Sequence, residues 1–201
     1  MNLSAQHSGF RTSSALLAAL VFGAACASAM VVVKRDFPQV VQRAEQIVIG
    51  TVTDIHEEQD VSGTPFTLVT FSDLTVLKGD VGLTLTLRFY GGHAGDVVVG
   101  IPDMPTFTPG ERDVLFVAGN NRDVCPLVGV WQGRFYVRLD PTLGTDVVED
   151  SAHRPLTGLV GRELVRAPAA AASGTMPMTL DDFRSLIADE LAQPHATDAT
   201  Q

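Results

Sequence analysis

Residues 83–90 have the sequence LTLTLRFY, which is the clearest periodic stretch of the chain. Large apolar side chains stand at every second position, and they are Leu83, Leu85, Leu87 and Phe89. Successive side chains of a β-strand point to opposite faces, so this alternation places all four on one face. The stretch therefore predicts a half-buried strand over residues 83–90.

The segments that precede this stretch predict two further strands. Residues 66–77 form a long, largely apolar run that ends in a tight turn shortly before residue 83. Residues 47–55 show a strand-like alternation, interrupted by Gly50, which predicts a bulge or bend there. Tight turns between successive strands indicate antiparallel pairing.

Beyond residue 90 the periodicity stops and then returns in shorter segments. Residues 91–110 are rich in glycine and proline and are too long for an ordinary connection, so we expect a long loop. The later strands expected are residues 114–117, a hairpin of residues 127–131 and 133–139 that turns near Gln132-Gly133, and a last short strand at Val147-Val148.

Two segments have helical periodicity. Residues 36–45 carry apolar side chains at i, i+3, i+4 and i+7, with Pro38 tolerated in the first turn. The second segment begins at Thr179, an expected N-cap, with Asp182 three residues further on. Its apolar stripe, which we expect to dock on the barrel, consists of Leu180, Phe183, Ile187 and Leu191.

Together these elements predict a mainly β fold. Five to seven short, mostly sequential strands without βαβ spacing favour a small antiparallel OB-like barrel, closed or half-closed, rather than a parallel sheet. A short N-terminal helix and a C-terminal helix accompany it.

The N-terminus has the pattern of an export signal. Arg11 precedes an apolar run over residues 15–25, and the small residues Ala27-Ser28-Ala29 fit a signal-peptidase site. Cleavage after Ala25 would instead leave Cys26 first, ready for a lipid anchor. The run is too short to cross a bilayer, so no transmembrane segment is expected. These features predict a periplasmic or extracellular protein.

The organisation expected from these patterns has one folded unit. Its parts are a signal peptide (1–29), a β-barrel domain (30–166), a linker (167–178), the C-terminal helix (179–193) and a disordered tail (194–201).

Charge excludes one class of partner. The chain has 201 residues, 45% of them hydrophobic, and a formal net charge of -9. Its only lysines are Lys34 and Lys78, and its arginines are scattered. Nucleic-acid binding needs a concentrated basic face, so nucleic acid is not an expected partner.

Three motifs carry a resemblance to a known family. They are residues 44–52 (AEQIVIGTV), residues 71–76 followed by Leu77-Lys78-Gly79, and residues 107–112 (FTPGER) before Val114-Leu115-Phe116. In this order they resemble the netrin-like and tissue-inhibitor-of-metalloproteinase barrel, and more closely a set of uncharacterised exported bacterial proteins. The resemblance covers about residues 40–140.

The resemblance implies an OB-like five-stranded barrel with a helix alongside it. It also implies metalloproteinase inhibition through an N-terminal cysteine that approaches zinc. This chain departs from that pattern because it has no cysteine framework, and its only candidate for the N-terminal cysteine is Cys26.

Catalytic and metal-binding patterns are weak. A zinc site needs about three converging ligands at short spacings, whereas His56, His93 and His153 are isolated. Cys125 could act as a nucleophile only beside a base such as His93 held by Asp96, and no nucleophile motif surrounds it. We therefore expect no metal, no cofactor and no catalytic residues.

Two regions are candidates for binding. The long loop carries the polar residues His93, Asp96 and Asp103, and the hairpin that follows contains Trp131 and Arg134. Trp and Arg are residues that commonly anchor interfaces. The alternative is structural: the loop caps the barrel with Ile101, Met104 and Phe107, the hairpin fills it, and the arginines are solvated.

The sequence thus predicts an exported, non-catalytic binding or accessory module with a protein partner in the cell envelope. An alternative is an inhibitor or regulator of an exported protease, including a metalloprotease. A third reading is a minor enzyme that uses Cys125.

Overall fold

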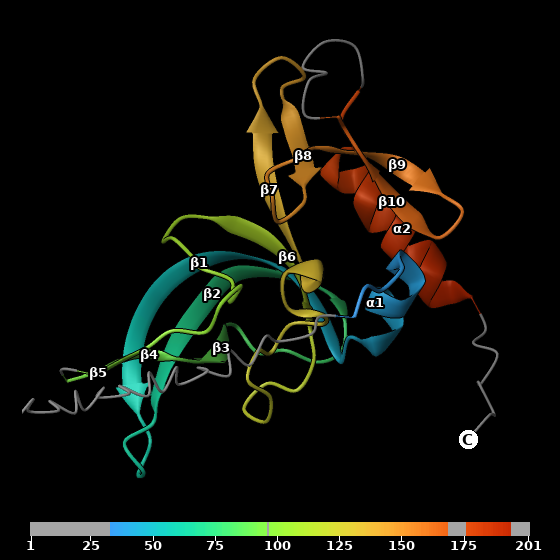
Figure 1. Cartoon of the computed structure of the whole chain (residues 1–201). Helices are drawn as coiled ribbons and strands as arrows, with labels where there is room; N and C mark the ends of the chain where they lie inside the picture. Colours follow the sequence, from blue (N-terminus) through green and yellow to red (C-terminus); the bar gives the residue numbers. More distant parts are fainter. Residues whose placement is uncertain (1–32, 96, 169–175, 194–201) are drawn as a thin grey trace, which may run out of the picture.

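The computed structural model describes residues 33–95, 97–168 and 176–193 (Figure 1). The predicted signal peptide, Cys26, Asp96, most of the linker and the tail lie outside these residues. Two helices and a six-stranded antiparallel sheet confirm the mainly β fold. The strands, in the order in which they lie in the sheet, are β3 (Leu85–Tyr90), β2 (Pro65–Lys78), β1 (Gln46–Gln59), β6 (Arg112–Val117), β7 (Arg134–Asp140) and β8 (Thr145–Glu149).

The sheet is strongly curved, and its ladder does not close. In Figure 1 the long β1–β2 hairpin bends away at one end, while the helices gather at the other. The two edge strands, β3 and β8, are not hydrogen-bonded to each other in the described part of the chain. Of the two forms expected from sequence, the sheet is therefore not the closed one.

Two small hairpins were not expected from sequence. One consists of β4 (Gly92–Ala94) and β5 (Val97–Val99), within the segment for which a loop was predicted. The other, β9 (Leu156–Val160) and β10 (Glu163–Arg166), follows the last predicted strand. This second hairpin forms one wall of the pocket described below.

Strand β3 is shorter than predicted. Leu83 is 95% exposed and precedes the strand, whereas Leu85, Leu87 and Phe89 are buried on one face as expected. The β2–β3 ladder ends where Phe71 pairs with Leu85. Two residues beyond Phe71, Asp73 has a positive φ of 52°, so β2 bends and offers Leu83 no partner.

The outer edge of β3 is capped by its own chain. The Asn120 side chain accepts a hydrogen bond from the Arg88 amide at 3.1 Å and donates one to the Thr86 carbonyl at 2.9 Å. The Tyr90 amide donates to the Val124 carbonyl at 2.9 Å. Three outward-facing backbone groups of this strand, the amides of Arg88 and Tyr90 and the carbonyl of Thr86, therefore have partners within the molecule.

Gly50 marks the predicted bulge. The β1–β2 register shifts between Ile49 and Thr51, which confirms the irregularity. A Cβ at Gly50 would lie 2.6 Å from the Leu74 Cδ2 and 3.2 Å from the Phe71 Cβ. A larger residue at position 50 would therefore require the Leu74 side chain to move and the strands to shift slightly.

Strand β6 lies between two hydrophobic cores. Val114 and Phe116 point into the first, with the helices, while Leu115 and Val117 point into the second, with β2 and β3. All four are fully buried, and burying each such side chain contributes roughly 1.5–3 kcal/mol. The expected short buried strand is confirmed and is buried on both faces.

Both predicted helices are present, and the second has the expected cap. Helix α1 (Phe37–Arg43) begins with a capping box between Asp36 and Gln39. Helix α2 (Leu180–Ala192) begins with one between Thr179 and Asp182. The buried stripe of α2 docks on the first core, where Phe183 contacts the rings of Phe37, Phe116 and Phe135.

The expected hairpin over residues 127–139 is wrong. Leu127 makes only an isolated bridge to Val117, and Val130–Gly133 form a short 3-10 helix, η1. Strand β7 begins at Arg134 and pairs with β6 and β8 instead. The cause is a pair of left-handed residues, Gly129 and Val130, which no extended strand can contain.

No helix within the described ranges is long and apolar enough to span a membrane.

Candidate functional site

The turn over residues 129–133 is strained and presents a tryptophan. Val130 has a φ of 61°, a conformation that costs a residue other than glycine roughly 1–3 kcal/mol. Gln132 holds the turn by accepting a hydrogen bond from the Arg35 amide at 2.8 Å. A Cβ at Gly133 would lie 2.7 Å from the Val128 carbonyl oxygen, so the turn is tightly packed. It leaves Trp131 40% exposed.

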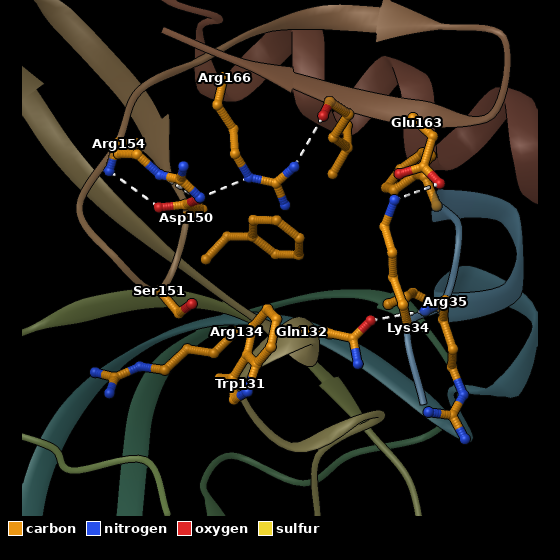
Figure 2. A pocket seen from close by; sticks show the side chains of 14 residues that line it. Lys34, Arg35, Trp131, Gln132, Arg134, Asp150, Ser151, Arg154, Glu163 and Arg166 are labelled. Carbon is orange, nitrogen blue, oxygen red and sulfur yellow. Dashed lines mark hydrogen bonds and ion pairs between the residues drawn. The ribbon is translucent and has the colours of Figure 1, made fainter. Parts of the chain in front are cut away.

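A pocket of about 230 Å³ lies on one side of Trp131, and we call it the arginine pocket (Figure 2). It lies between four segments, which are the residues just before α1, the turn over residues 129–133, the loop after β8, and β10. Its apolar lining comes from Phe37, Val40, Trp131, Phe135 and Leu164. Its polar lining comes from Lys34, Arg35, Gln132, Arg134, Asp150, Ser151, Arg154, Glu163 and Arg166.

A second pocket, of about 450 Å³, adjoins the first, and we call it the loop pocket. Residues 103–106 of the long loop form one wall, and Tyr136 and Ala152 contribute to the others. The residues that line both pockets are Trp131, Arg134, Ser151 and Arg154. The partly exposed Trp131 side chain therefore lies between the arginine pocket and the loop pocket.

Arg134 is buried, contrary to the expectation of a solvated arginine. Only 2% of it is exposed. Its Nη2 donates to Glu111 at 2.8 Å and to Asp113 at 3.0 Å, and its Nη1 donates to the Thr106 carbonyl. Its guanidinium also stacks 3.9 Å from the Phe107 ring centre. Arg134 thus ties β7 to β6 and to the long loop, and two carboxylates already neutralise its charge.

Asp113 is the buried partner of Arg134. It is fully buried, its Oδ1 has no hydrogen-bond partner, and neither has the Nε of Arg134. Burial raises the pKa of Asp113 to about 6, because the loss of hydration outweighs the attraction of Arg134. The nearby carboxylate of Glu111 raises it further.

This raised pKa predicts a stability that increases on mild acidification. Between about pH 4 and pH 6 the folded Asp113 holds a proton that the unfolded chain has lost, so the contribution is complete near pH 4 and is lost as the pH rises through 6. The gain is at most about 3 kcal/mol. Urea unfolding at about pH 7.5 and about pH 5 should show roughly half of this maximum, because the titration is only partly complete at pH 5.

The Asp113→Asn variant is the control for that experiment, because it removes the titrating group and should flatten the profile. Asp36 and Asp150 have lowered pKa values and lose their contributions only in stronger acid. A wild-type stability that does not increase on acidification, or an increase that survives Asp113→Asn, would contradict the assignment.

Asp150 organises the cationic wall of the arginine pocket. Its Oδ2 accepts from the Arg154 Nη2 and from the Arg166 Nε, each at 2.7 Å. Its Oδ1 accepts from the backbone amides of Ala152 and Arg154. Burial alone would raise the pKa of Asp150, but these hydrogen bonds outweigh it and hold the pKa below the ordinary value.

The residues predicted for binding do not all meet. Asp103, Trp131 and Arg134 all line the loop pocket. His93 lies elsewhere, on β4, with its Nδ1 2.7 Å from a carboxylate oxygen of Glu57 on β1. Asp96 lies outside the described residues.

The long loop also closes the second core. Phe107 packs 5.7 Å from the Phe71 ring and 5.1 Å from the Phe89 ring, measured between ring centres. Met104 packs against the same core, and Ile101 and Met104 line a further pocket together with Val69 and Phe89 of that region. The loop therefore has a structural part, residues 104–107, as well as the pocket wall.

Cys125 and the described histidines have separate environments. Their ring nitrogens contact the carboxylates of Asp54, Glu57 and Glu149. Burial raises the pKa of the Cys125 thiol to about 11, so it is protonated at neutral pH. In the ranges that the structure covers, no three or more His, Cys, Asp or Glu side chains group as metal ligands.

The sequence patterns did not predict the roles of Asp150, Arg154 and Arg166. They missed the β9–β10 hairpin, which brings Arg166 to Asp150. One signal could have found them, since three arginines fall between residues 154 and 166 in an acidic chain. No protein-family model matches the chain, and no curated protein matches it.

Proposed function

We propose that this chain is an exported, non-catalytic binding module whose ligand binds around Trp131, across the arginine pocket and the loop pocket. One observation carries the proposal: a strained turn holds a large, half-exposed aromatic side chain on the ridge between two pockets. Backbone strain persists where the surrounding structure enforces it, and it clusters at ligand sites.

Trp131 is suited to this task. Tryptophan offers a large rigid contact area and is enriched among the residues that dominate binding energy. It is also the only tryptophan of the chain. A solitary tryptophan left partly in water on a tight turn supports recognition more than core packing.

Support for a non-catalytic role comes from the state of the reactive groups. The Cys125 thiol is held protonated by burial, and the three described histidines contact the carboxylates of Asp54, Glu57 and Glu149 instead of a nucleophile. Turnover of any substrate that is abolished by changing Cys125 would contradict this part of the proposal.

Export and an envelope partner rest on the sequence of residues 1–29, which lie outside the described part. Cleavage after Ala25 would leave Cys26 available for a lipid anchor, whereas cleavage after Ala29 would remove it. The pocket region is the same in both products. Within the inhibitor alternative, zinc chelation depends on Cys26 at the mature N-terminus, whereas other inhibitory contacts do not. Intact-mass measurement of the secreted product shows whether the mature chain begins at Cys26 or at Met30.

Replacing Trp131 by alanine should abolish partner capture. Immobilised mature protein is used to capture proteins from the envelope fraction, and the captured protein is identified and titrated. We expect at least about a thirtyfold loss of affinity, because truncating a central aromatic residue commonly costs 2 kcal/mol or more. The melting temperature should change little, because the side chain is not part of either core.

Leu139→Ala is the matched control, because Leu139 is an exposed apolar residue that lines neither pocket. It should leave capture unchanged. Capture that survives Trp131→Ala would overturn the proposed site. Identification of the captured protein as a protease would favour the inhibitor alternative.

A further inference from the structure

The arginine pocket carries an excess of positive charge on an acidic protein. Arg154 and Arg166 share the single carboxylate of Asp150, which leaves one positive charge uncompensated. Arg35 forms no ion pair with any described residue, and its Nη1 donates to the Val33 carbonyl. With a chain charge of -9, this concentration makes the pocket a local attractor for anions.

Arg166 offers hydrogen-bond donors that are already positioned. Its Nε is held by Asp150 at 2.7 Å and its Nη1 by the Leu164 carbonyl at 3.0 Å. Its Nη2 has no partner among the described residues, and Figure 2 shows the side chain reaching from β10 toward the middle of the pocket. The Ser151 hydroxyl, which also lines the pocket, makes no hydrogen bond within the same residues.

Such a donor favours binding because little freedom remains to be lost. A guanidinium fixed at two of its nitrogens can bind an anion without the ordering cost that a mobile side chain incurs. Guanidinium groups match the planar geometry of a carboxylate, and hydrogen bonds between charged groups are roughly twice as strong as neutral ones.

The floor of the pocket is apolar. Phe37, Val40 and Phe135 are buried side chains that face it, and Leu164 adds a fourth. The volume of about 230 Å³ is smaller than the ~300–1,000 Å³ of ordinary ligand pockets. The pocket therefore suits one apolar side chain with an anionic group beside it.

The ligand has a path out of the pocket. Trp131 and Ser151 line the arginine pocket and the loop pocket alike, so a chain that leaves the first over Trp131 enters the second. A free small acid would occupy only the arginine pocket. An extended chain would use both, and this continuity favours a peptide.

From these observations we infer that the arginine pocket binds the carboxy-terminal residue of a peptide. Its apolar side chain lies on the Phe135 floor, its terminal carboxylate accepts hydrogen bonds from Arg166, and the preceding residues cross Trp131. This inference rests on the proposed function and specifies the ligand class of the same site.

The first test uses the fluorescence of Trp131, which as the only tryptophan reports on this site alone. The mature protein is titrated with an N-acetylated tetrapeptide, acetyl-Ala-Ala-Ala-Leu, carrying either a free terminal carboxylate or a terminal amide. We expect the carboxylate form to bind at least about tenfold more tightly, as befits the loss of a charge-assisted hydrogen bond.

Arg166→Gln should abolish this preference by weakening the carboxylate form to the level of the amide form. The variant should fold, because Asp150 retains Arg154 and two backbone donors. Should its melting temperature fall sharply, Arg35→Gln replaces it, since Arg35 leaves no acid unpaired; a severalfold weaker carboxylate affinity is then expected. The matched control is Arg184→Gln, which removes an exposed α2 arginine outside both pockets.

Each of the other possible results of the titration contradicts a specific part of the inference. Equal affinity for the two tetrapeptides would overturn carboxylate recognition and leave binding at Trp131 intact. No binding of either would overturn the inference, while the Trp131→Ala capture experiment still decides the proposed function. N-acetyl-leucine that binds as tightly as the tetrapeptide would make the ligand a small acid instead of a peptide.

Discussion

Replacing Arg134 by methionine is expected to lower the free energy of unfolding by about 3–5 kcal/mol at neutral pH. Methionine fills much of the space but cannot donate to Asp113, which lies fully buried 3.0 Å from the guanidinium. An unpaired buried carboxylate keeps the full cost of lost hydration. Urea denaturation followed by Trp131 fluorescence and circular dichroism measures the effect.

A double variant separates the ion pair from the space that it fills. Asp113→Asn combined with Arg134→Met removes both buried charges and should recover most of the loss. The loss in the single variant should also shrink near pH 5, where Asp113 can take up a proton. A loss below about 1 kcal/mol at neutral pH would mean that Arg134 does not stabilise the buried carboxylate of Asp113.

Phe183→Ala is expected to cost a similar amount, about 3–5 kcal/mol. Phe183 is fully buried, and its ring lies 5.0 Å from that of Phe135 and 5.6 Å from that of Phe37, measured between centres. Truncation therefore leaves a cavity where α2 meets the first core. Guanidinium unfolding followed by far-ultraviolet circular dichroism gives the change.

Arg184→Ala is the control beside it, because Arg184 is an exposed neighbour on the same helix and should stay within about 0.5 kcal/mol of the wild type. If Phe183→Ala were equally harmless, α2 would contribute little to the folded unit. A helix that melts before the sheet in the wild type would lead to the same conclusion.

Local signals predicted the elements that they encode directly. The capping box of α2, its apolar stripe and the bulge at Gly50 each depend on residues close in sequence, and the structure contains all three. The mainly β class followed from the alternation of apolar and polar residues, because successive side chains of a strand point to opposite faces of the sheet. Boundaries were less predictable, because Leu83 fits the alternation and fails only when β2 bends away.

The rest depended on contacts that sequence spacing does not reveal. A positive φ at Val130 is unfavourable for a β-branched residue, so no local pattern predicts the turn that holds Trp131. The environment of Arg134 is set by β6, where Asp113 is a buried acidic residue followed by four apolar ones. The anionic centre of the arginine pocket, Asp150, acquires its role only when β10 brings Arg166 to it.

The Asn120 cap on β3 bears on how the protein behaves when it is concentrated. An uncapped outer strand is a template on which a neighbouring molecule can add its own strand, and repetition of that step produces fibrils. Here a side-chain amide occupies the positions that such a neighbour would take, at the Arg88 amide and the Thr86 carbonyl. Asn120 therefore leaves a second molecule fewer free backbone groups on this edge to which it could add a strand.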